Sequence, residues 1–225
     1  MGDIGIEVAD YRIVQDGKDI LLPLAKEVWD STIINVNVLI NGCKQIRDNQ
    51  TSESSLFENT LVQQCLVMLV TGLEVYTKNR FLEMEKNGRI PNTEALVKEF
   101  ASSESVRREL DGYSHSHKVT TLQSLIRLRN NGLINFQDWE KCKRAFNKGY
   151  NIKFAEIKDL NPTILENIKK YCQWRHKIIH SKKYMGMLNM EEVPPKEPIF
   201  ATIEFIEKAR NEFKEFIEKL HAETV

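Results

Sequence analysis

Three side chains that could carry out chemistry lie within six residues of one another near the middle of the last third of the chain. They are Arg175, His176 and His180. An imidazole ionises near neutral pH and can donate or accept a proton, whereas a guanidinium keeps its charge and binds a phosphate through two parallel N–H groups. These residue types therefore predict a site that binds or transforms an anion.

The element that carries these residues is predicted to be a helix that begins at Asn161 and Pro162, because asparagine caps helices and proline fits the first helical position. Its apolar side chains recur on one face: Ile164, Ile168, Tyr171 and Ile178. Arg175 shares that face, where a guanidinium is costly unless it finds a carboxylate, a phosphate or a solvated cleft. His176 and His180 are neighbours at i and i+4.

Two interpretations of Arg175 follow from spacing alone. In the first, Arg175 and the histidines bind an anion. In the second, Arg175 pairs with a structural glutamate while the histidines sit half-exposed at a helix C-terminus, where a cation suits the helix dipole. Glu74 is the candidate glutamate, as the one acid in the most apolar part of an earlier helix (65–81), although Lys78 at i+4 is an alternative partner for it.

The order of the motif resembles a known signature. Arg175, four intervening residues and His180, with polar His176 directly after the arginine, resemble the Arg-x(4 to 6)-His signature of the HEPN superfamily. Leu73–Tyr76 followed by Arg80–Phe81 also resembles the corresponding helix of HEPN proteins. The resemblance implies an all-α, HEPN-like helical bundle, here with extra short helices and a short N-terminal extended arm.

The resemblance also implies a function. Many HEPN domains are metal-independent ribonucleases of toxin, antiphage and RNA-processing systems, in which two protomers face their motif helices across a homodimer. His180 would then be general base or acid, Arg175 would clamp the transition state, and His176 would orient the phosphate or support His180. We expect an endoribonuclease that attacks with the ribose 2′-hydroxyl, has an RNA substrate, needs no cofactor or metal, and acts with an antitoxin or defence-system partner.

Further residues are assigned around this motif. Lys177, Lys182 and Lys183 are predicted to contact the RNA substrate, and Glu74 and Tyr171 to support the site. The alternative function is a non-catalytic HEPN-like helical binding or adaptor protein that acts through a partner. The two functions differ in the surroundings expected for Arg175, which are carboxylates within one protomer for the adaptor and a two-fold cleft between protomers for the nuclease.

The 225 residues suffice for one domain with a sizeable core, predicted over 21–225 after an N-terminal arm over 1–20. Lys and Arg number 32, and Asp and Glu also number 32, so no global basic field attracts nucleic acid and RNA binding must be local. The sequence shows neither a secretory signal nor an uninterrupted apolar run that could span a bilayer, which predicts a cytoplasmic protein without membrane contact.

The remaining patterns concern structure. Four cysteines without a C-x-x-C pair are predicted to be reduced core thiols: Cys43, Cys65, Cys142 and Cys172. Long helices are expected over about 22–47 and 55–86, and another over about 200–221. Asp111–Lys118, rich in Gly, Ser and His, is predicted to be a polar loop. Thr120 or Thr121 is expected to cap the next helix.

Overall fold

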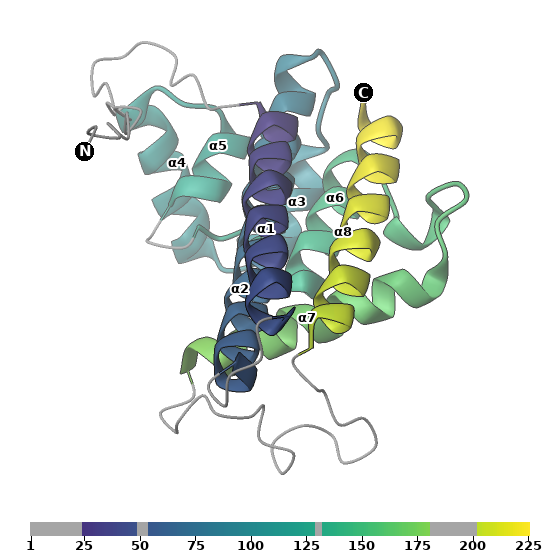
Figure 1. Cartoon of the computed structure of the whole chain (residues 1–225). Coiled ribbons are helices and arrows are strands. Elements are labelled where there is room, and N and C mark those ends of the chain that lie inside the picture. The colour runs from purple at the N-terminus through teal and green to yellow at the C-terminus, as the bar shows by residue number, and fades with distance from the viewer. Residues whose placement is uncertain (1–23, 49–53, 129–131, 181–201) are drawn as a thin grey trace, which may run out of the picture.

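The computed structural model describes residues 24–48, 54–128, 132–180 and 202–225, and these contain helices and no strand. The long helices are α1 (Ala25–Asp48), α2 (Ser54–Lys86), α7 (Pro162–His180) and α8 (Ile203–Thr224). Between α2 and α7 come α3 (Thr93–Phe100), α4 (Glu104–His117), α5 (Thr121–Arg127), α6 (Trp139–Tyr150) and the 3-10 turn η1 (Phe154–Glu156). The expected all-α bundle with extra short helices is confirmed (Figure 1). The predicted N-terminal arm lies outside the described residues.

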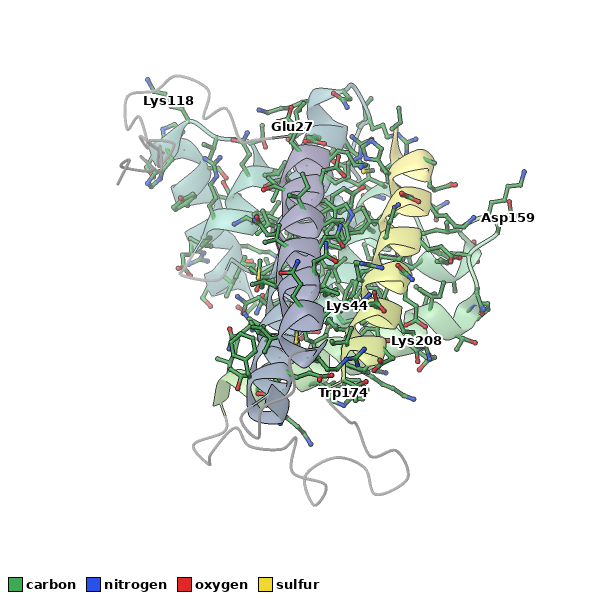
Figure 2. All side chains as sticks on the ribbon, in the orientation of Figure 1. Glu27, Lys44, Lys118, Asp159, Trp174 and Lys208 are labelled. Atoms are coloured by element: carbon green, nitrogen blue, oxygen red, sulfur yellow. The ribbon has the colours of Figure 1, made fainter. Side chains whose placement is uncertain are left out.

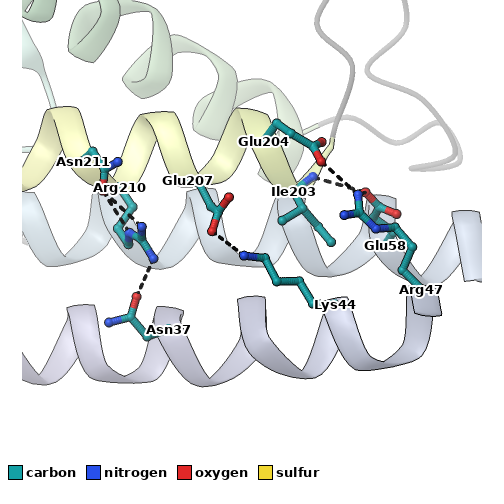
Figure 3. Close-up of polar contacts among 9 residues, drawn as sticks. All are labelled: Asn37, Lys44, Arg47, Glu58, Ile203, Glu204, Glu207, Arg210 and Asn211. Carbon is teal, nitrogen blue, oxygen red and sulfur yellow. Dashed lines mark hydrogen bonds and ion pairs between the residues drawn. The ribbon is translucent and has the colours of Figure 1, made fainter. Parts of the chain in front are cut away.

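Polar contacts fix the direction of α1 against α8. Arg47 lies 2.9 Å from Glu204, Lys44 lies 2.7 Å from Glu207, and the Arg210 guanidinium donates to the Asn37 side chain at 2.8 Å (Figure 3). Residue numbers rise along α8 while they fall along α1, so the two helices are antiparallel.

The long α2 runs parallel to α8 beside it. The Glu58 carboxylate accepts a hydrogen bond from the backbone N–H of Ile203 at 3.2 Å, and so caps the first turn of α8. Near the other end, the Arg80 Nε atom donates to the Thr224 hydroxyl at 2.8 Å. The Glu58 carboxylate, near the start of α2, therefore links the first turns of the two helices.

The core lies between these long helices and the short ones. Its largest fully buried side chains include Trp29 of α1, Tyr76 and Phe81 of α2, and Phe213 of α8. By length and composition Phe57–Lys86 is the one described helix that could cross a membrane, but more than half of its most apolar window is buried inside the protein. Its apolar character is accounted for by its place in the core.

The helix that carries the motif crosses the end of the bundle where α8 begins (Figure 1). Its start agrees with the prediction, since the Asn161 side chain accepts a hydrogen bond from the N–H of Thr163 at 3.0 Å. The predicted apolar face is also confirmed as buried. Trp174 lies against the first turns of α8, with its ring centroid 5.6 Å from that of Phe205 (Figure 2).

The polar segment after residue 110 is helical, so the prediction of a loop there was wrong. Helix α4 runs to His117 and is capped at its start by Ser103, whose hydroxyl accepts from the N–H of Val106. The Ser114 hydroxyl lies 2.6 Å from that of Ser124 on α5, which shows that packing between the two helices outweighs the local preference of Gly and Ser for turns. The cap at Thr120 is confirmed, as a capping box with Gln123.

Candidate functional site

A cleft of about 640 Å³ lies beside the motif helix. One wall is the stretch Cys172–Lys177 of α7, a second is formed by Val70 and Glu74 of α2, and a third by residues 135–140, which lead into α6. Its volume is that of a pocket for a small molecule or a nucleotide. Arg175 and His176 of the motif line this cleft, and so does Lys177, which follows them in the sequence.

The side chain of Arg175 is partly buried, and its Nε atom is fully buried without a hydrogen-bond partner. Among the described residues no carboxylate forms an ion pair with its guanidinium. A buried N–H that lacks a partner costs free energy comparable to a lost hydrogen bond. In the described part of the chain, the cation in the wall of the cleft therefore has no ion-pair partner.

Glu74 lies close enough to Arg175 for their charges to interact, but it does not pair with it. Burial raises the pKa of the Glu74 carboxyl, and a hydrogen bond from the Gln137 side chain, the charge of Arg175 and that of Lys78 oppose this rise. Neither cation forms an ion pair with Glu74 within the described part of the chain. Both partnerships considered from the sequence are thus absent there, and the hydrogen bond to Glu74 comes from Gln137.

Tyr171, which was predicted to support the site, lies on the buried side of α7. Its hydroxyl donates a 2.6 Å hydrogen bond to Glu212 of α8, and Asn167 donates to the other oxygen of that carboxylate at 2.9 Å. Burial and the neighbouring carboxylate both raise the pKa of Tyr171, so its hydroxyl keeps its proton at neutral pH. These bonds fix α7 against α8 one turn before Arg175.

Of the remaining residues assigned to the site, the structure describes the side chains of His176 and Lys177 but not those of the rest. His176 is exposed and Lys177 is partly buried at the cleft. His180 is the last residue of α7, about 140° around the axis and about 7.5 Å along it from Arg175. The side chain of His180 and the whole of Lys182 and Lys183 lie outside the described residues.

Several cleft residues were not anticipated from the sequence. Gln137 and Asp138 precede α6 by one or two positions, and Lys169 lies on α7. The sequence signals the start of α6, since Asp138 accepts hydrogen bonds from the N–H groups of Glu140 and Lys141. No local signal, however, places this segment against Arg175, which lies more than thirty residues further along the chain.

Cys172, the cysteine that lines the cleft, is a protonated thiol at neutral pH. Burial raises the pKa of Cys172 to about 12, so little thiolate is present at neutral pH. The four cysteines are free; Cys172 is partly buried and the other three are fully buried, in agreement with the prediction of reduced core thiols. Within the described ranges, no three His, Cys, Asp or Glu side chains cluster in a way that could hold a metal ion.

Comparison with known proteins finds a match to a protein family. No curated protein and no solved structure matches the chain significantly. The model of the family described as RiboL-PSP-HEPN matches residues 31–224, a range that extends from α1 to the end of α8 and includes the cleft and Arg175. Because this match covers most of the chain, the protein belongs to the RiboL-PSP-HEPN family, one of the HEPN families.

Proposed function

We propose that the protein is a metal-independent endoribonuclease that acts at a composite site formed by the motif helices of a homodimer. The observation that carries this proposal is the unpaired Arg175 guanidinium in the wall of the cleft. An adaptor that uses Arg175 as a structural cation would surround it with carboxylates, and none pairs with it among the described residues. HEPN membership supports the proposal further, since many HEPN domains cleave RNA.

The proposed reaction needs three groups. His180 accepts the proton of the ribose 2′-hydroxyl as its oxygen attacks the neighbouring phosphorus, and a second imidazole of the composite site protonates the leaving 5′ oxygen. Arg175 binds the non-bridging oxygens, where negative charge accumulates in the transition state. His176 orients the phosphate or supports His180. The products are a 2′,3′-cyclic phosphate and a 5′-hydroxyl end.

The charge on one wall of the cleft supports the same substrate. Lys177 lines the cleft together with Arg175, and Lys182 and Lys183 follow the motif in the sequence. The RNA backbone would thus meet positive charge along α7, although the chain has no net charge and carboxylates stand on the other walls. We further propose that the protein acts in the cytoplasm, in a toxin–antitoxin or antiphage setting, where an antitoxin or defence-system protein controls it.

The test is cleavage of a mixed RNA pool in excess EDTA, with the product ends identified. The wild type should leave cyclic phosphate ends, while His180→Ala and Arg175→Ala should lose cleavage and remain folded. His115→Ala is the control, because His115 is exposed on α4 and does not line the cleft. Cleavage retained in either motif variant would refute the proposed roles. No cleavage by a folded, dimeric wild type would favour the adaptor.

The composite site has its own test. Specific activity and the fraction of dimer, measured by analytical ultracentrifugation over the same dilution series, should fall together. A monomer that cleaves RNA as fast as the undiluted protein would show that one chain carries a complete site.

A further inference from the structure

Three carboxylates line the cleft, and they differ in what already binds them. Asp138 caps α6, because its Oδ1 atom accepts the two backbone N–H groups at the start of that helix. Glu140 forms ion pairs with Lys143 at 3.0 Å and Lys169 at 3.3 Å. Among the described residues the Glu74 carboxylate has one hydrogen bond, from Gln137, although its two oxygens can accept about four. Glu74 is therefore the cleft acid that neither caps a helix nor forms an ion pair in the described part of the chain, and it is the best placed of the three to accept hydrogen bonds from a ligand.

The surroundings of Glu74 suit a flat aromatic ligand with N–H groups. Val70 lies one helical turn before Glu74 on α2, and Trp139 and Trp174 provide further apolar lining. On α7, Arg175 and Lys177 supply cationic groups to the same cleft, and His176 supplies an imidazole. A nucleotide has matching parts, since its base is flat and partly apolar and its phosphate is anionic.

The four RNA bases differ in what they offer to a carboxylate. Guanine presents two adjacent N–H donors on its Watson–Crick edge, from N1 and N2, which match the two oxygens of a carboxylate. Uracil places its single N–H between two carbonyl oxygens, which a carboxylate repels. In cytosine and adenine one amino group stands beside a ring nitrogen that is itself an acceptor. Guanine alone fills both carboxylate oxygens without a change of protonation.

We propose that the cleft is a guanine-binding subsite, in which Glu74 accepts hydrogen bonds from N1 and N2 of the base and Gln137 holds the carboxylate in place. The bound guanosine is the nucleotide that retains the cyclic phosphate after cleavage. This assignment of the cleaved position rests on the proposed ribonuclease function. Recognition of the base itself does not, because it is measurable by binding.

The binding experiment uses isothermal titration calorimetry of the full chain with four probes, the 3′-monophosphates of guanosine, adenosine, cytidine and uridine. The guanosine nucleotide should bind at least about tenfold more tightly than the others, since one good bidentate contact has that effect. Inosine 3′-monophosphate keeps the N1 donor and lacks the N2 amino group, so its affinity should be intermediate. Equal binding of all four ribonucleotides would overturn the proposal.

Two substitutions test whether Glu74 itself, rather than any acidic residue of α2, sets the preference for guanosine. Glu74→Gln exchanges one acceptor oxygen for an amino group and should remove the preference for guanosine. Glu85→Gln is the matched control, because Glu85 is also a partly buried acid of α2, bound to the Thr120 hydroxyl and outside the cleft. A guanosine preference that persists in Glu74→Gln, or that disappears in Glu85→Gln, would contradict the assignment to Glu74.

The outcomes also separate this proposal from the nuclease proposal. Selective guanosine binding without any RNA cleavage would sustain the subsite and refute catalysis. RNA cleavage together with equal binding of the four nucleotides would sustain catalysis and refute the subsite.

Discussion

Tyr171 of α7 and Glu212 of α8 are joined by a 2.6 Å hydrogen bond in which the phenol donates to the carboxylate. Glu212 is 14% exposed and its other oxygen accepts from Asn167. The carboxylate thus receives bonds from two positions of α7 that are four residues apart. This double contact sets the position of α7, and with it the position of Arg175 one turn later.

Tyr171→Phe removes one of these bonds and leaves an oxygen of Glu212 without its donor. We expect the free energy of unfolding to fall by about 2 kcal/mol, as for a hydrogen bond to a charged group. RNA cleavage should fall only a few-fold, because Tyr171 supports the site and does not line the cleft. Urea denaturation measures the first effect. Tyr113→Phe is the control, since the Tyr113 hydroxyl has no hydrogen bond among the described residues and should change stability by less than about 0.5 kcal/mol.

Arg175→Met should abolish RNA cleavage while the free energy of unfolding stays unchanged or rises by about 1 kcal/mol, because it removes a buried N–H that lacks a partner. Arg80→Met makes the useful comparison. One buried nitrogen of Arg80 also lacks a partner, but Arg80 is 3% exposed and binds both Thr224 and Glu83. Its replacement removes these bonds and should cost about 3 kcal/mol. If Arg175→Met proves as destabilising as Arg80→Met, Arg175 is a structural cation.

Gly72→Ala should disturb the contact between α1 and α2. A Cβ at position 72 would lie 2.6 Å from the side chain of Thr32, closer than atoms can approach without a shift of one helix. We expect a loss of about 1–3 kcal/mol in the free energy of unfolding. Gly112→Ala should instead stabilise by about 0.5–1 kcal/mol, since position 112 is helical and nothing lies within 4 Å of a Cβ there. Thermal denaturation of the two variants should therefore shift in opposite directions.

Stability should depend on pH through His221, whose Nδ1 atom lies 3.1 Å from the Tyr76 hydroxyl. Burial lowers the pKa of His221, the charges of Arg80 and Lys26 lower it further, and Glu83 and Asp30 oppose them. Below about pH 7 the unfolded chain, with an ordinary histidine pKa, therefore binds more protons at this residue than the folded chain. This contribution to stability should be complete above about pH 7 and decline as the pH falls toward 5.

Urea denaturation of the wild type and of His221→Gln across this range isolates the effect, because the other titrating groups are common to both. The decline should be smaller in His221→Gln and unchanged in His115→Gln, whose histidine is exposed on α4. Parallel profiles for the wild type and His221→Gln would show that His221 titrates alike in the folded and unfolded chain.

Local sequence patterns were enough to predict the all-α class, the start of α7 at Asn161 and Pro162, its buried face and the motif that indicated a HEPN domain. These features depend on residues within a few turns of each other, where periodicity and capping act. The prediction of a loop over Asp111–Lys118 was wrong, because the composition of this segment favours a turn while contacts to α5 hold residues 111–117 in a helix.

The surroundings of Arg175 could be learned only from the tertiary structure. Glu74 was one candidate for its ion-pair partner, yet Glu74 pairs with no cation among the described residues and accepts a hydrogen bond from Gln137. No sequence pattern placed Gln137 there. The cleft arises where α2, α7 and residues 135–140 meet. Such a meeting depends on how distant segments pack around a shared core, and no local pattern of residue types encodes it.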